Sequence, residues 1–310
     1  MRNAKKALVL LNMGGARSKE ELAIFLKNMF NDENILTMKN KRLRSMIASF
    51  IISSRLDEAW ENYEEIGGKS PLHELTQKLV KKLQIELKDE YFVTTTMRYT
   101  EPFAKDTIEE LKQNNIDEIV LFPLYPQYST TTTKSSLDDF IQHVKMDYKI
   151  TVIAPFYKND LFNDAICDEI KRVKEEQEDY YLIFSAHGLP QKMIKKGDPY
   201  QEQIENHVKL LKKKLKERNI NFQGVYLAYQ SKVGPMKWLE PSLDYMLEFF
   251  KDKKVIIYPI AFIIDNSETI FELDIEYREI AEHIGLKDYK VCSCVNDSAK
   301  FIDVVKQLVN

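Results

Sequence analysis

Cysteine, glycine and proline are scarce in this chain. Its 310 residues include 3 Cys, 9 Gly and 10 Pro. So few cysteines are typical of a reducing compartment and exclude a small scaffold held together by disulfides. An iron–sulfur cluster normally takes four thiolates, more than Cys167, Cys292 and Cys294 can supply. We interpret Cys292 and Cys294 as small residues at the end of a late strand.

An excess of charge and a long hydrophobic run are also missing. The formal net charge is −3, so the composition gives no sign of a nucleic-acid partner. No apolar run reaches the roughly 18 residues that would cross a bilayer. The short apolar run 7–11 does not resemble a signal peptide, so we expect a cytoplasmic protein, either free or associated with a membrane surface. Neither a Gly-x-Gly-x-x-Gly nor a Walker A motif occurs, which argues against the common nucleotide-binding loops.

The composition, with 44% hydrophobic and 30% charged residues, is typical of a folded protein. Along the chain, short apolar runs alternate with helical patterns. Runs this apolar predict strands buried on both faces, and hence parallel sheets with crossover helices, an α/β fold. The predicted strands are 7–12, 92–97, 118–124, 150–153, 181–185, 224–228 and 255–262. The predicted helices include 18–28, 102–114, 135–146, 159–175, 201–218 and 268–283.

The alternation occurs twice, which predicts two lobes. We place the first at residues 1–158 and the second at 159–296, with a last helix in 297–310 that packs back on the first lobe. Two open α/β sheets would leave a cleft between the lobes, and such sheets bind ligands outside the carboxyl ends of their strands.

One histidine stands out from the other four. His187 follows the apolar run 182–186 and precedes a turn, so we expect its imidazole at the carboxyl end of a buried strand, where α/β proteins collect functional groups. An imidazole can accept or donate a proton near neutral pH. The remaining histidines lie in helical patterns rich in Lys and Glu, which favours solvated or structural roles: His73, His143, His207 and His283.

An acidic stripe follows the last predicted strand. Glu268, Glu272 and Glu276 recur every four residues and so share one helix face. A solvated stripe is the simpler interpretation. However, like charges at this spacing destabilise a helix by a few tenths of a kcal/mol per pair unless a cation or shared protons compensate them. Carboxylates also suit hard divalent ions and weakly held ferrous iron.

Three other stretches each have two interpretations. Residues 39–52 form a helix with a basic start, which is either half-buried or an apolar lip for a membrane surface or an apolar ligand. The loops 123–133 and 229–238 carry aromatic and hydroxyl groups, which either pack locally or contact a large planar ligand with acidic edges.

Several ordered motifs resemble one family, the ferrochelatases. They occur in family order over nearly the whole chain, which makes the resemblance specific. The motifs are Leu-Asn-Met-Gly-Gly at 11–15, Ile-Gly-Gly-Lys-Ser-Pro-Leu at 66–72, Met-Arg-Tyr at 97–99, Tyr-Pro-Gln-Tyr-Ser at 125–129, Ser-Ala-His-Gly-Leu-Pro at 185–190, Gln-Ser-Lys-Val-Gly-Pro at 230–235 and Phe-Glu-Leu-Asp-Ile-Glu-Tyr at 271–277.

The resemblance implies two similar flavodoxin-like lobes, each a parallel sheet flanked by helices, with a porphyrin cleft between them. It implies that His187 and Glu268 are catalytic residues that also meet the metal, and that Glu272 and Glu276 form an acidic relay. We hypothesise that His187 and Glu268 face each other across the substrate. It also implies a set of porphyrin-binding residues. These are Met13, Arg55, Tyr63, Ser70, Arg98, Tyr99, Tyr125 and Ser129.

The function implied is a lyase that inserts Fe2+ into protoporphyrin IX to form protohaem, the last step of haem biosynthesis. Ferrous iron and the porphyrin are then substrates, with no permanently bound cofactor and no iron–sulfur cluster. A coproporphyrin ferrochelatase, another tetrapyrrole metal chelatase and a non-catalytic tetrapyrrole carrier are the alternatives, and the sequence leaves the oligomeric state open. One departure stands at Asn266, where many relatives carry a histidine, so the claim that two histidines meet the metal does not transfer.

Overall fold

The structure is a computed structural model that describes residues 6–145, 147–176, 178–232, 234 and 236–309. The chain divides into two compact units. Unit 1 comprises the chain up to Tyr125, Ser129–Ala154 and the residues from Lys306 on, and unit 2 comprises Pro126–Tyr128 and Pro155–Val305.

Unit 1 is built on a four-stranded parallel sheet with the order β2-β1-β3-β4. The strands are β1 (Lys6–Asn12), β2 (Tyr91–Met97), β3 (Glu118–Pro123) and β4 (Lys149–Val152). The central strand β1 pairs with both β2 and β3, and the side chains of Ala7–Leu11 are fully buried. This burial on both faces explains why the strand is apolar without alternation.

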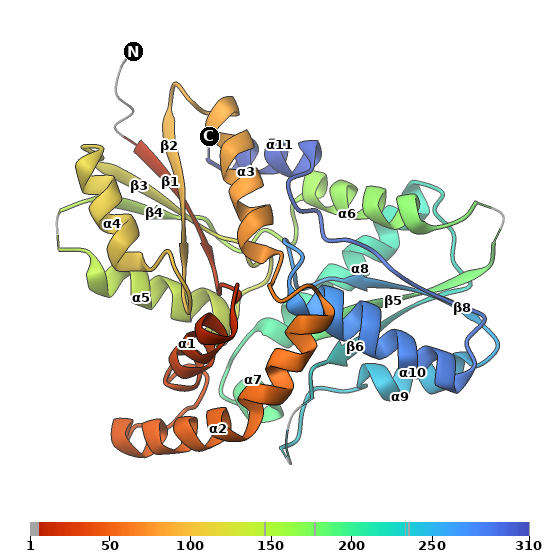
Figure 1. Cartoon of the computed structure of the whole chain (residues 1–310). Helices are drawn as coiled ribbons and strands as arrows, with labels where there is room; N and C mark the ends of the chain where they lie inside the picture. The colour runs from red at the N-terminus through yellow and green to blue at the C-terminus, as the bar shows by residue number, and fades with distance from the viewer. Residues whose placement is uncertain (1–5, 146, 177, 233, 235, 310) are drawn as a thin grey trace. The chain divides into compact units, whose positions relative to one another are not determined.

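Helices cover both faces of this sheet. α4 (Ala104–Gln113) and α5 (Ser135–His143) pack on the face that carries Val9 and Leu11, and α3 (Leu72–Glu86) lies on the opposite side (Figure 1). α1 (Lys19–Phe30) and α2 (Lys41–Glu65) pack on each other, and a short π-helix, η1 (Thr130–Lys134), leads into α5.

Unit 2 has the same topology, a four-stranded parallel sheet with the order β6-β5-β7-β8. The strands are β5 (Tyr180–His187), β6 (Gly224–Gln230), β7 (Lys254–Pro259) and β8 (Asp288–Val291). In both sheets the second strand along the chain lies on one side of the first strand, and the third and fourth strands lie on the other side. This order is the flavodoxin-like arrangement. In unit 2 this change of side falls between β5 and β7, so the carboxyl ends of these two strands meet at the point where such sheets bind ligands.

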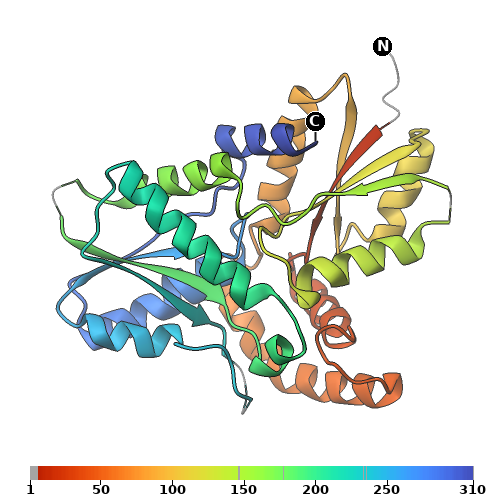
Figure 2. The ribbon, with the colours of Figure 1, turned by 180° about the vertical axis from the view of Figure 1, so that it is seen from behind.

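The helices of unit 2 also form two layers. α9 (Leu243–Leu247), η2 (Glu248–Phe250), η3 (Glu268–Glu276) and α10 (Tyr277–Ile284) pack on the face that carries Ile183 and Ile257. α6 (Asp160–Val173) and α8 (Tyr200–Glu217) lie together on the other face, as the view from behind shows (Figure 2). The short α7 (Gln191–Lys195) follows β5, and α11 (Ala299–Val309) ends the described chain.

The predicted α/β fold with two similar parallel sheets flanked by helices is confirmed. One element differs in kind, because the segment Glu268–Glu276 is a π-helix and becomes α-helical only from Tyr277 on. Hydropathy could not reveal this, since a wider turn still places residues four apart near one another. No helix in the described part of the chain is long and apolar enough to cross a membrane.

Candidate active site

Two side chains meet at the carboxyl edge of the sheet in unit 2. His187 is the last residue of β5, and Glu268 opens η3 after the neighbouring strand β7. The His187 Nδ1 lies 2.8 Å from the Glu268 Oε2. The sequence leads to the hypothesis that the two residues face each other across a substrate, but they are hydrogen-bonded neighbours because β5 and β7 are adjacent parallel strands.

This contact fixes the role of each imidazole nitrogen. Because the carboxylate accepts, Nδ1 carries the proton of the hydrogen bond, and no described residue bonds to Nε2. The Tyr200 hydroxyl donates to the backbone carbonyl of His187 over 2.9 Å and so holds the end of the strand. The His187 side chain is 37% exposed.

A second carboxylate stands one step along η3. Glu272 accepts hydrogen bonds from Gln230 Nε2 over 3.0 Å and from Ser231 Oγ over 2.6 Å. Gln230 is itself held, because its Oε1 accepts from Ser185 Oγ over 2.8 Å. The end of β6 therefore pins Glu272 beside the His187–Glu268 pair, while Glu276, at the end of η3, is exposed to solvent.

The electrostatics of the site favour shared protons. Burial lowers the pKa of His187, but the Glu268 carboxylate, by its charge and its hydrogen bond, outweighs burial and, with Glu272, raises the pKa to about 9. Burial and the charge of Glu268 raise the pKa of Glu272 to about 7, against the opposing hydrogen bonds from Ser231 and Gln230. At neutral pH the pair His187–Glu268 thus holds a proton, and Glu272 is poised to take or release one.

The first turn of η3 is fixed by hydrogen bonds from its own loop. The Asn266 Oδ1 accepts from the Glu268 backbone N–H over 2.8 Å. Asp265 accepts from Thr269 Oγ1 over 3.0 Å and from Asn296 Nδ2 over 2.7 Å. Because Glu268 is the first residue of η3, these contacts decide where its carboxylate lies.

Unit 1 brings three predicted porphyrin-binding positions together at its own sheet edge. The Met13 carbonyl accepts from the Tyr99 N–H over 2.9 Å, and the Ala16 carbonyl accepts from the Ser70 N–H over 2.8 Å. The two glycines after Met13 allow this close packing. Gly14 has φ +98°, and a Cβ there would lie 2.3 Å from the Thr100 Oγ1.

The predicted porphyrin-binding residues Arg98 and Tyr99 share one buried polar partner inside unit 1. The buried Asp32 accepts from the Tyr99 hydroxyl over 2.9 Å and from an Arg98 N–H over 3.1 Å, and it also bonds to Ser135. Arg98 contacts Asp139 over 3.2 Å as well, and its side chain is only 19% exposed. The charge and hydrogen-bonding capacity of these residues are therefore largely used within the protein.

The remaining predicted positions differ in exposure. Arg55, on α2, is exposed and makes no ion pair with any described residue. Tyr63, on the same helix, is buried and its ring stacks on Trp60, with centroids 6.3 Å apart. Tyr125 is buried and bonds to Ser136 over 3.0 Å, and Ser129 is buried and caps η1.

Sequence reasoning missed three residues that shape the site. The sequence pattern places Ser231 only in an aromatic and hydroxyl-rich loop, and it marks Asn266 only as a departure from the family pattern. Tyr200 opens α8, 13 positions from the carbonyl it contacts, and nothing in the local pattern indicates that contact. Ser231 has φ +65°, a strained conformation of the kind found at functional sites, but this is visible only in the structure.

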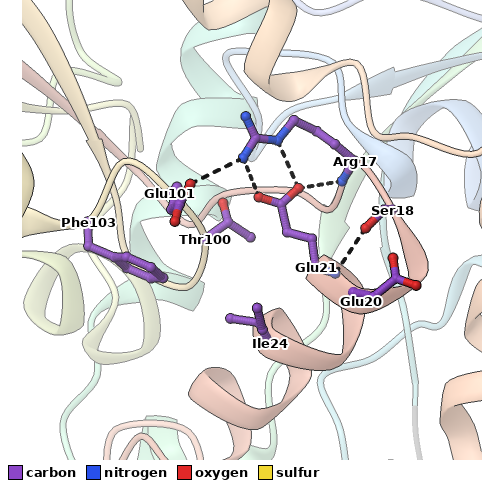
Figure 3. Close-up of a pocket in the computed structure, with 8 residues that line it drawn as sticks. All are labelled: Arg17, Ser18, Glu20, Glu21, Ile24, Thr100, Glu101 and Phe103. Atoms are coloured by element: carbon purple, nitrogen blue, oxygen red, sulfur yellow. Dashed lines mark hydrogen bonds and ion pairs between the residues drawn. The ribbon is translucent and has the colours of Figure 1, made fainter.

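A hollow of about 360 Å3 lies elsewhere, on unit 1, and Figure 3 shows its lining. Arg17 binds Glu21 there through its side chain, with Nε to Oε2 at 2.8 Å, and contacts Glu101 at 4.0 Å. None of the predicted site residues lines it, and its one basic side chain, Arg17, is already paired with Glu21. We do not assign the chemistry to this hollow.

In the described part of the chain, no group of three or more His, Cys, Asp or Glu side chains is arranged to hold a metal ion. The three cysteines are buried free thiols. Burial raises the pKa of the Cys167 thiol to about 12, and burial likewise raises the pKa of Cys292 and of Cys294.

The fold places the chain among the chelatase-like α/β proteins. SirB from Bacillus subtilis with Fe3+ superposes with a TM-score of 0.60 at 10% identity, covering 98% of this chain and 94% of that one. DR2241 from Deinococcus radiodurans, described as having structural similarity to chelatases, gives a TM-score of 0.55 at 13% identity; it covers 98% of this chain, which spans 55% of that longer protein. At these identities the likeness concerns the fold.

Sequence comparison gives the family. The sequence model named Ferrochelatase matches residues 5–310. A protein named ferrochelatase from a Nitratiruptor species is 53% identical over 305 residues, 97% of each chain. Those of Wolinella succinogenes and Helicobacter pylori are 49% and 45% identical and cover 99% of this chain, which spans 98% and 93% of theirs. The chain belongs to the ferrochelatase family, whose members are metal chelatases and hence lyases.

Proposed function

We propose that this chain inserts ferrous iron into a porphyrin through the His187–Glu268 pair. Iron insertion is the activity of the family, and ferrous iron is a substrate in it. The observation that carries the assignment of residues is the 2.8 Å hydrogen bond from His187 Nδ1 to Glu268, because it commits Nδ1 to the carboxylate and leaves Nε2 as the nitrogen that can exchange a proton with the substrate.

The reaction requires two proton transfers. A porphyrin loses its two inner N–H protons as its four nitrogens bind Fe2+, so each insertion releases two protons overall. A ring bent out of plane exposes the nitrogen lone pairs, and a site that binds the bent form better than the flat one lowers the barrier. His187 Nε2 would accept a pyrrole proton while Nδ1 passes one to Glu268.

The pKa order supports an outward path for these protons. His187 is protonated at neutral pH before the reaction, so it must first release a proton to accept another. The approach of a divalent cation lowers the proton affinity of nearby groups and drives this release. Glu272, with a pKa of about 7, would take up the proton, and the exposed Glu276 would pass it to water.

The test uses His187→Ala and Glu268→Gln, with Glu282→Gln on the exposed face of α10 as a matched control. Insertion of Fe2+ into a porphyrin is followed anaerobically by absorbance, and porphyrin binding by fluorescence quenching. Loss of a general acid–base group costs about 10²–10⁴-fold in rate. We expect losses of that size for the first two variants with porphyrin affinity retained. Wild-type rates in both would exclude the assignment.

Substrate contacts are proposed on unit 1. The exposed Arg55, without an ion pair among the described residues, is suited to a porphyrin carboxylate. Met13 and Ser70, which share one sheet edge, would complete this contact. Arg55→Ala should raise the porphyrin KM and leave kcat unchanged, whereas unchanged KM would rule out the contact. Parallel assays with protoporphyrin IX and coproporphyrin decide which ring is preferred.

We propose further that the enzyme carries no iron–sulfur cluster, because its three cysteines are one too few for the usual ligand set. Iron and sulfide analysis of the purified protein tests this, and stoichiometric sulfide would contradict it.

A peripheral contact with an anionic membrane surface is proposed for α2. Four apolar side chains lie at i, i+3, i+4 and i+7 on this helix and are exposed, and three exposed basic residues, Lys39, Lys41 and Arg42, lie at or just before its start. The apolar residues are Leu43 (45% exposed), Met46 (70%), Ile47 (36%) and Phe50 (73%). Basic residues beside an apolar stripe match anionic headgroups over acyl chains.

Vesicle sedimentation tests this contact. Three basic residues at about 1 kcal/mol each predict about a hundredfold preference for vesicles with anionic lipid over zwitterionic ones. Met46→Ser with Phe50→Ser should abolish binding, whereas Ile85→Ser, which removes an equally exposed apolar residue from α3, should not. If all variants sediment alike, or if the double variant loses only porphyrin affinity, the stripe does not serve a membrane.

A further inference from the structure

The loop that leads into η3 contains a buried amide whose two polar atoms are both engaged. Asn266 is 8% exposed, its Oδ1 accepts from the Glu268 N–H over 2.8 Å, and its Nδ2 donates to the Ile264 carbonyl over 3.1 Å. Its own backbone N–H is bound by Thr269 Oγ1 over 3.0 Å. One side chain therefore links the end of the β7 loop to the first residue of η3.

We propose that Asn266 is a positioning residue for iron insertion, which holds the Glu268 carboxylate on His187. The inference rests on the proposed function, because it assigns Asn266 to the placement of a group assumed there to act. The first backbone N–H groups of a helix have no partner within the helix, and a side-chain acceptor just before them fixes the first turn.

The chemistry of the side chain explains why an amide fits here. An amide offers an acceptor and a donor on one carbon, which is what the Glu268 N–H and the Ile264 carbonyl require. Asn266 thus has a role that needs no titration. Without the Asn266 side chain, the Glu268 N–H loses its acceptor, and only the contacts of Asp265 and of the Asn266 backbone with Thr269 still hold the first turn of η3.

The effect on catalysis follows from the need for precise placement. A misplacement of about 1 Å at a reacting group costs up to about a hundredfold in rate. We therefore expect Asn266→Ala to lower kcat by about tenfold or more, with the porphyrin KM within twofold of wild type. Asn266→Ser, which restores an uncharged side-chain oxygen that can accept from the Glu268 N–H, should recover most of the lost kcat.

Asn159→Ala is the matched control. Asn159 caps α6 in the same unit, where its Oδ1 accepts from the Phe162 N–H over 2.9 Å. It should lower the melting temperature about as much as Asn266→Ala and leave kcat at the wild-type value. If Asn266→Ala does not fold, Asn266→Gly replaces it, because glycine also removes the side-chain acceptor and adopts the backbone conformations of a loop without steric cost.

Three results would overturn the inference: an unchanged kcat in Asn266→Ala, an equal loss of kcat in Asn159→Ala, or no recovery in Asn266→Ser. His187→Ala and Glu268→Gln are assayed alongside. If these two retain wild-type rates, the proposed function fails; if they lose activity while Asn266→Ala does not, only the positioning role fails.

Discussion

Replacing Glu268 by Gln should change the protonation of His187 more than any other single substitution. Burial disfavours the imidazolium, and the adjacent carboxylate at 2.8 Å reverses this and raises the His187 pKa to about 9. Gln keeps the shape of the side chain and removes the charge. The His187 pKa in Glu268→Gln should therefore fall to the ordinary value of about 6.5 or below.

The same argument predicts a change in stability. A fall of the His187 pKa from about 9 to about 6.5 corresponds to a free-energy difference of roughly 3 kcal/mol between the two protonation states. Because the His187 side chain is 37% exposed, solvent screening reduces the contribution to stability to about half of this value. Since the folded pKa is raised, this stability is fully present below about pH 6.5 and is lost as the pH rises through about 9. In Glu268→Gln that loss should be absent.

Two measurements follow this prediction. Nitrogen-15 NMR of labelled histidine gives the titration of each imidazole, and urea unfolding at a series of pH values gives the free energy of unfolding. His207 is the internal control. It is fully buried between Gln127 and Asn163, burial lowers its pKa to about 3, and it should stay neutral in both proteins. A wild-type His187 that titrates near 6.5, or one that still titrates near 9 in Glu268→Gln, would refute the reasoning.

Three further predictions concern the same network and the core of unit 1. Because His187 must be neutral to accept a proton, kcat/KM for the porphyrin should rise with pH between about 7 and 9, and a flat profile would contradict this. Because the folded protein raises the pKa of Glu272 to about 7, the free energy of unfolding should fall as the pH rises from about 4.5 to 7, by no more than about 3 kcal/mol. Urea unfolding of Glu272→Gln should not show this fall. Asp32→Ala leaves Arg98 and Tyr99 without their buried acceptor, so it should cost about 3–5 kcal/mol in urea unfolding, and a cost below about 1 kcal/mol would show that the network is not a support.

The strands of both sheets could be predicted because they are apolar on both faces. β1 is an example, since every side chain from Ala7 to Leu11 is fully buried. No range was predicted for β8, although Cys292 and Cys294 just after it were interpreted as the end of a late strand. Its sequence Asp-Tyr-Lys-Val, at Asp288–Val291, alternates at the edge of the sheet, and four such residues give no apolar run.

The site could be predicted in part. The position of His187 at the end of a buried strand indicated a functional edge, and the order of the motifs indicated the family. The direct bond to Glu268 depends on β5 and β7 being neighbours, which the sequence does not state. The burial of Tyr99 on Asp32 could not be foreseen either, because the two residues are 67 positions apart and Asp32 lies in no recognised motif.

The most direct test of the central claim is the rate of Fe2+ insertion by Glu268→Gln, measured anaerobically at saturating porphyrin over a pH range of about 6–9. If the hydrogen-bonded pair moves the protons, the rate falls by about 10²–10⁴-fold at every pH while the porphyrin still binds. A Glu268→Gln enzyme that metalates the ring at the wild-type rate would show that the protons leave by another path.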